Sequence, residues 1–134
     1  ETGYYAFRQT LKKNGLMPGL LKGIDYINRD EGRHIGYGTY LISRLVNKDS
    51  RNYDVFMDQM NKLFPYAIGL TTERSDENAG VFGMEPGFTT EYAQKQFAIR
   101  LSKIERAKKQ SMQELVQETN KEFDTLDEEV VSAS

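Results

Sequence analysis

The run from about Pro18 to about Val46 constrains the fold most, because its apolar positions recur alternately every four and three residues. The positions in this seam are Leu20, Ile24, Ile27, Glu31, His34, Gly38, Leu41 and Leu45. That period is the signature of one face of an α-helix packed into a bundle. A helix of this length is unusual in a small globular protein but normal in a bundle. The sequence therefore predicts an all-α fold.

Two positions of the seam, Glu31 and His34, carry ionisable side chains where aliphatic ones are expected. A carboxylate that leaves water needs a compensating partner. A divalent or trivalent metal ion is one such partner, because it binds a carboxylate and an imidazole that project from the same helix face. The alternative is a buried hydrogen-bonded pair, satisfied by Arg29 or Arg33. The Glu-x-x-His spacing by itself does not decide between them.

Composition excludes several classes of protein. The 134 residues suffice for one domain, and a net charge of −2 argues against nucleic acid as a partner. The absence of cysteine excludes disulfides and thiolate metal sites. No stretch approaches the roughly 20 apolar residues of a membrane span, so we expect no transmembrane segment. The absence of cysteine fits a reducing compartment, and we expect a cytoplasmic location. The chain begins Glu1-Thr2-Gly3 without Met, and we expect it to be one piece of a longer protein.

The remaining segments read as further helices. Residues 1–14 read as the end of a helix that Asn14-Gly15 stops. Asp49 or Ser50 is expected to cap a helix that Pro65 ends, and residues 69–88 read as a loop. A helix follows from Thr89 or Thr90 to about Lys109, and Ser111-Met112-Gln113-Glu114 forms a capping box before a short helix. We expect residues 119–134 to be an acidic, frayed tail, which leaves 1–118 as the folded domain.

The stretch Arg29-Asp30-Glu31-Gly32-Arg33-His34-Ile35 resembles the Asp-Glu-x-x-His core of the ribonucleotide reductase small-subunit superfamily. The arginine before the histidine and the isoleucine after it look more like the oxidases of that superfamily than like its reductase subunits. The segments Glu1–Phe7 and Gly15–Leu21 also resemble those ligand-binding oxidases. The resemblance is clearest over residues 1–46.

This resemblance implies the C-terminal part of a ferritin-like helical bundle and a dinuclear Mn/Fe cofactor, with two irons as the alternative. It implies an oxidoreductase that activates dioxygen, performs a two-electron oxidation and binds a long-chain fatty acid, with a tyrosine–valine crosslink near the metals. Glu31 and His34 match metal ligands and are the candidate catalytic residues. Asp30 matches an acid that orients a ligand histidine on another helix. Tyr4 and Ile27 are the residues assigned to the ligand pocket.

The other metal ligands of the superfamily, three carboxylates and one histidine, have no match in this sequence. We expect an N-terminal segment of the same protein to supply them, and we expect a homodimer, as is common among these relatives. Two other functions stay open. One is a ribonucleotide reductase small subunit, which stores an oxidising equivalent for a large partner. The other is a non-catalytic helical module with a buried Glu–His pair.

Overall fold

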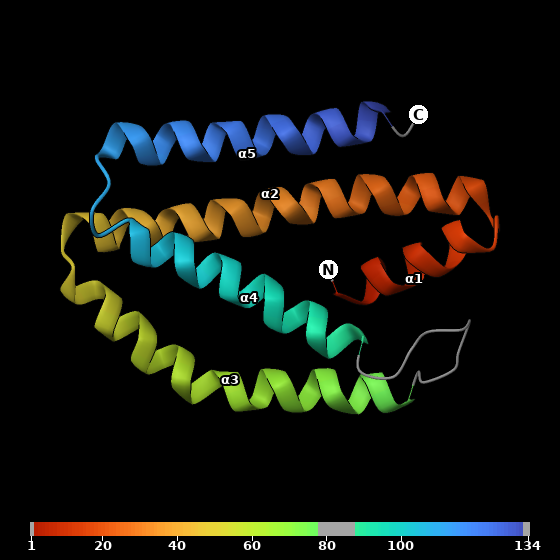
Figure 1. Cartoon of the computed structure of the whole chain (residues 1–134), viewed down its shortest axis with the longest axis horizontal. Helices are drawn as coiled ribbons and strands as arrows, with labels where there is room; N and C mark the ends of the chain where they lie inside the picture. The colour runs from red at the N-terminus through yellow and green to blue at the C-terminus, as the bar shows by residue number, and fades with distance from the viewer. Residues whose placement is uncertain (1, 78–87, 133–134) are drawn as a thin grey trace.

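The structure, a computed structural model, describes residues 2–77 and 88–132 (Figure 1). Five helices account for most of these residues: α1 (Thr2–Lys13), α2 (Pro18–Lys48), α3 (Arg51–Glu77), α4 (Phe88–Arg106) and α5 (Met112–Ser132). No strand occurs among the described residues. The expectation of an all-α, ferritin-like bundle is confirmed at the level of fold class.

The long helix α2 is the centre of the fold, and each of the other four helices contacts it. Figure 1 shows α5 running antiparallel along one side of α2, with α4 along the other side and α3 beyond α4. The core is formed by Leu11, Ile24, Val46, Ile104, Ala107 and Leu115, each at most 5% exposed. The side chains of Arg8 and Asp25 form an ion pair between α1 and α2.

The helix limits that depend on local chemistry agree with the sequence. Gly15 has φ of 62°, and the amide of Leu16 donates to the carbonyl oxygen of Leu11 at 3.0 Å, so α1 stops where it was predicted to stop. Pro18 occupies the first turn of α2. Asp49 accepts a hydrogen bond from the amide of Arg51 at 3.0 Å and caps α3.

The Asp49 carboxylate also binds the Arg51 guanidinium at 2.6 Å. These side-chain and backbone hydrogen bonds from Arg51 lower the pKa of Asp49 to about 2.

The capping box before α5 is also confirmed. The amide of Ser111 donates to Glu114 Oε2 at 2.7 Å, and the amide of Glu114 donates to Ser111 Oγ at 3.2 Å. The hydrogen bonds from the amide and hydroxyl of Ser111 lower the pKa of Glu114. The helix that follows is not short, since α5 continues to Ser132. Residues 119–132 are therefore helical where the sequence predicted a frayed tail.

Two helix limits in the middle of the chain were also predicted wrongly. Helix α3 does not end at Pro65 but continues to Glu77, so residues 69–77 are helical, and residues 78–87 of the expected loop lie outside the described residues. Proline removes one backbone hydrogen bond and bends a helix without always ending it. Figure 1 shows such a bend near the middle of α3. Helix α4 ends at Arg106, three residues before the expected end at Lys109.

The largest correction concerns the face that α2 buries. The expected seam is largely open to solvent, with exposed fractions of 45% for Leu20, 41% for Ile27 and 57% for Leu45, and only Ile24 of that set is buried. The buried residues of α2 are Ile24, Gly36, Ser43 and Val46. At about 100° per residue this buried face lies roughly a third of a turn away from the seam.

Small residues explain which face of α2 is covered. A Cβ atom at Gly36 would lie 2.7 Å from Phe123 of α5, and one at Gly32 would lie 3.1 Å from Leu126. The two glycines therefore let α5 approach α2 closely, and the aromatic and aliphatic side chains of α5 fill the space above them. We call the other side, defined by Leu20, Ile27, Glu31, His34, Gly38, Leu41 and Leu45, the seam face.

Candidate metal centre

Glu31 and His34 lie next to each other near the middle of α2. Residues three apart in a helix project from the same side, and here His34 Nδ1 lies 4.0 Å from Glu31 Oε2. The His34 side chain is 76% exposed and the Glu31 side chain 45% exposed. The buried, hydrogen-bonded pair that the sequence also allowed is therefore not formed in this chain. Both side chains are instead accessible to a metal ion or to another protein segment.

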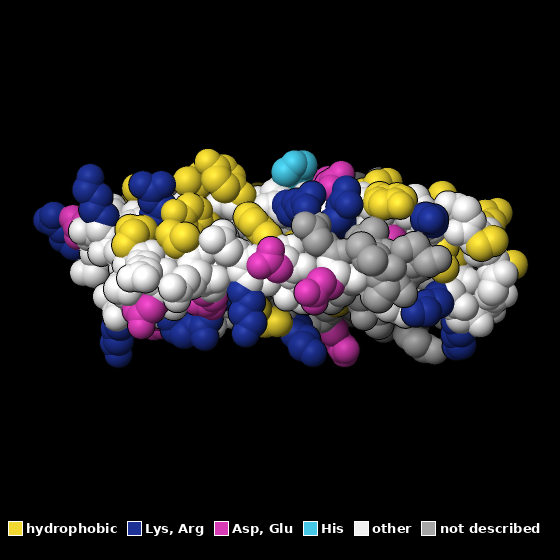
Figure 2. All heavy atoms as spheres, turned by 90° about the horizontal axis from the view of Figure 1, so that it is seen from above, with side chains coloured by type: hydrophobic (Ala, Val, Ile, Leu, Met, Phe, Trp, Pro, Cys, Tyr) yellow, Lys and Arg dark blue, Asp and Glu magenta, His cyan; other side chains and the backbone are white. Residues whose placement is uncertain are grey.

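Apolar side chains flank this pair along the seam face. Ile27 lies one turn before Glu31, and Leu41 lies two turns after His34, with exposed fractions of 41% and 39%. Tyr37, three residues after His34, is 55% exposed. In Figure 2 the single histidine stands at the margin of the molecule, with hydrophobic side chains on both sides along the same margin. An apolar strip with two metal-type donors in it is a surface that further protein is expected to cover.

Asp30 is held by arginines of its own helix. Its Oδ1 accepts from Arg29 Nε at 3.2 Å and lies 3.8 Å from Arg33 Nη1. The guanidinium of Arg29 also lies over the ring of Tyr26, 5.4 Å from its centroid. The Asp30 side chain is 55% exposed, so one of its oxygens can accept a hydrogen bond from outside this chain. Its predicted role in orienting a histidine stays a prediction.

Of the two residues assigned to the ligand pocket, Ile27 and Tyr4, only Ile27 has a described side chain. Ile27 lies on the seam face, one turn from Glu31. Tyr4 belongs to α1, but its side chain lies outside the described residues. Within residues 2–77 and 88–132, no group of three or more His, Cys, Asp or Glu side chains could hold a metal ion.

The donor set still fits part of a metal centre. One carboxylate and one neutral imidazole on one helix face are ligands that Mn and Fe accept. Two donors leave most of a coordination shell to be supplied from elsewhere. The pair therefore has the donor chemistry of one edge of a metal site.

A groove on the neighbouring, buried face of α2 was not predicted from the sequence. It has a volume of about 450 Å³ and lies between α4 and α5 above α2. Its lining comprises Gly32, Ile35, Gly36, Thr39, Tyr92, Lys95, Gln96, Ile99, Arg100, Lys103, Glu122 and Leu126. The signals in the sequence were Gly32 and Gly36, four residues apart, and the basic residues Lys95, Arg100 and Lys103.

Comparison with known proteins gives the family. The sequence model described as "Ribonucleotide reductase, small chain" matches residues 2–108, which include Glu31 and His34 but not α5. The comparison with solved structures found no match. None of the described helices is both long enough and apolar enough to cross a membrane. Because the match covers most of the chain, this protein belongs to the ribonucleotide reductase small chain family.

Proposed function

We propose that this chain supplies Glu31 and His34 to a dinuclear Mn/Fe centre of a cytoplasmic, dioxygen-activating oxidase that binds a long-chain fatty acid. The observation that carries the proposal is the placement of a carboxylate and an imidazole side by side on an exposed apolar face of the longest helix. The family is one of oxidoreductases with a dinuclear metal centre. Mn/Fe loading and oxidase activity are the finer part of the proposal, supported by the resemblance of the segment around Glu31 to the oxidases.

The rest of the site is proposed to come from another segment of the same protein that packs on the seam face. A centre of this type takes its carboxylates and histidines from four helices of one bundle. The exposed Ile27, Leu41 and Leu45 give such a segment an apolar surface to bury. An apolar cover also removes water from Glu31 and His34, which strengthens their binding of a cation. We further propose that the complete protein is a homodimer.

Each residue assigned to the proposed site has a definite role. The Glu31 carboxylate and the His34 imidazole would be ligands of the metal centre. Asp30, which also accepts a hydrogen bond from Arg29, would accept one from a histidine of the covering segment and fix its ring. Ile27 and Tyr4 border the acyl chain of the fatty acid. When bound, the metals supply the electrons for reducing dioxygen and the oxidising power for the substrate.

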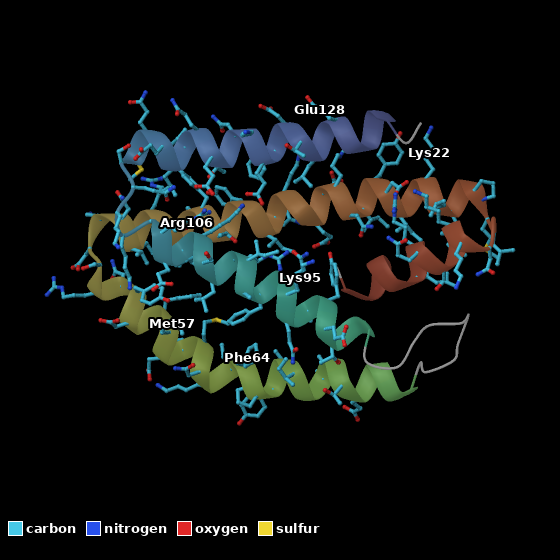
Figure 3. All side chains as sticks on the ribbon, viewed as in Figure 1. Lys22, Met57, Phe64, Lys95, Arg106 and Glu128 are labelled. Carbon is cyan, nitrogen blue, oxygen red and sulfur yellow. The ribbon has the colours of Figure 1, made fainter. Side chains whose placement is uncertain are left out.

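Substitution of the two donors tests the proposal. We expect Glu31→Ala and His34→Ala each to lower the metal content of the purified protein by at least one ion per chain, measured by mass spectrometry of Mn and Fe. Glu128→Ala is the matched control, because Glu128 is an exposed carboxylate on α5, away from the seam face (Figure 3). Unchanged metal content in both donor variants would refute the assignment of the site.

A reductase small subunit is the second candidate, because the matched family is described by that function. The oxidase and the reductase subunit are distinguished by the metals, lipid and radical found in the purified protein. The oxidase is expected to contain Mn and Fe together and to release a fatty acid on solvent extraction. A reductase subunit is expected to bind a large partner subunit and to show a stored radical by electron paramagnetic resonance. A protein with neither metal nor lipid would favour the non-catalytic module.

A further inference from the structure

The groove between α4 and α5 lies on the face of α2 that is about a third of a turn from the seam face, and none of its lining residues belongs to the proposed metal centre. Its floor is formed by Gly32, Ile35, Gly36 and Thr39 of α2. A volume of about 450 Å³ falls within the range of small-molecule sites. The groove is thus large enough for an organic ligand of moderate size, and the seam face contributes nothing to it.

The charges of the groove favour an anion. Lys95, Arg100 and Lys103 line it, and Glu122 is the one acidic residue in the part of the lining that the structure describes. Lys103 Nζ donates to Glu122 Oε2 at 2.7 Å, and the Lys103 side chain is only 23% exposed. An ammonium group has three N–H donors, so the bond to Glu122 leaves donors of Lys103 available. In Figure 3, Lys95 is labelled on the side of α4 that faces α2.

The apolar part of the lining indicates that the bound anion also carries an apolar group. Ile35, Ile99 and Leu126 contribute aliphatic surface from three different helices. Ile99 is 44% exposed, so part of this surface is open to a ligand. A simple inorganic anion would leave that apolar surface in water. A ligand with both a charged and an apolar part would cover it.

We propose that this groove binds a ligand that carries a phosphate group next to an apolar portion. The phosphate lies against the lysines of α4, and the apolar portion lies along Ile35, Ile99 and Leu126. A phosphate monoester carries a charge of about −1.5 to −2 at neutral pH, which suits the basic side chains of Lys95 and Lys103 in this lining. The ligand is either a soluble phosphate ester or the headgroup region of a phosphate-bearing lipid.

The test measures binding of phenyl phosphate to the complete protein as isolated, by calorimetry and by amide chemical shifts. Phenyl phosphate combines a dianion with an apolar ring, and phenol is the uncharged control. Vesicles of phosphatidylcholine with and without phosphatidic acid form the lipid arm. We expect saturable binding of phenyl phosphate or of the phosphatidic acid vesicles, with the arm that binds identifying the source of the phosphate.

Variants decide whether the groove is responsible. Lys95→Gln and Lys103→Gln are expected to weaken binding by about tenfold each, as is typical of a lost charge-assisted hydrogen bond. Glu122→Gln is expected to tighten binding, because it removes the competing negative charge while keeping the shape of the side chain. Lys62→Gln, in an exposed ion pair with Asp58 on α3, is expected to change nothing. Absence of binding in both arms, or equal affinities for the wild type and all variants, would overturn the proposal.

Discussion

The contact between Gly36 and Phe123 gives the most specific prediction about the fold. A Cβ atom at residue 36 would lie 2.7 Å from Phe123 Cε1. Carbon atoms do not approach comfortably below about 3.5 Å, so the ring must retreat by roughly 0.8 Å in the Gly36→Ala variant. Such overpacking costs about 1–3 kcal/mol. The higher helix propensity of alanine returns about 1 kcal/mol. We therefore expect a net loss of stability of up to about 2 kcal/mol.

A substitution at a second, uncontacted glycine separates the effect of the Phe123 contact on stability from the effect of helix propensity. Gly69 lies inside α3, and a Cβ atom there would meet nothing within 4 Å. Gly69→Ala is therefore expected to stabilise the protein by up to about 1 kcal/mol. Both variants are compared by urea unfolding followed by circular dichroism. Hydrogen exchange of the α5 amides provides a local readout, and it is expected to accelerate only in Gly36→Ala.

A double variant completes the experiment. In a Phe123→Ala background the clash is absent, so Gly36→Ala should become neutral or stabilising, and the two substitutions should not be additive. If Gly36→Ala stabilises the protein as much as Gly69→Ala does, α5 does not pack on α2 at this glycine. That result would refute the role of the two glycines in selecting the face that α2 buries.

Three further predictions concern the helix cap before α5 and the ion pair between α1 and α2. Ser111→Ala removes the acceptor for the amide of Glu114 and should cost about 1 kcal/mol in urea unfolding. The pKa of Glu114 in the folded protein is lowered from its ordinary value of 4.5. Its contribution to stability is therefore complete above pH 4.5 and is lost as the pH falls through the pKa of the folded state. Glu114→Gln should flatten this dependence of stability on pH in acid titrations. Asp25→Ala removes the partner of a part-buried guanidinium on α1 and should destabilise the protein by about 1.5–3 kcal/mol. Asp58→Ala, in an exposed pair, should change stability by under about 1 kcal/mol, and equal effects would contradict the greater contribution of the Arg8–Asp25 pair.

Local chemistry made several features of this fold predictable. The stop after α1 needs only Asn14-Gly15, and the start of α5 needs only the reciprocal bonds of Ser111 and Glu114. The adjacency of Glu31 and His34 follows from the helical period alone. These predictions involve residues within one or two turns of each other, so they did not depend on tertiary packing.

The buried face of α2 could not be predicted in the same way. Apolar side chains on the seam face indicated burial, but the described helices pack on the neighbouring face, where Gly32 and Gly36 admit Leu126 and Phe123. Which face is covered depends on the partner helix. That partner, α5, was expected to be short and to fray from residue 119, because the acidic composition of residues 119–134 concealed the contacts of Phe123 and Leu126 with α2.

The groove escaped prediction for a related reason. The basic residues of α4 form a regular helical stripe, which on an isolated helix is a solvated face. They line a groove only because α5 returns antiparallel to α2 and places Glu122 opposite Lys103 (Figure 1). Contacts between residues so far apart in the sequence cannot be read from local spacing.

Anomalous X-ray scattering at the Mn and Fe edges, on crystals of the complete protein as isolated, tests the proposed metal centre most directly. We predict one peak of each element beside Glu31 and His34, with further ligands contributed by a segment that covers the seam face. Iron at both positions would keep the site but contradict the mixed-metal oxidase. The absence of any peak near these two residues would contradict the metal centre itself.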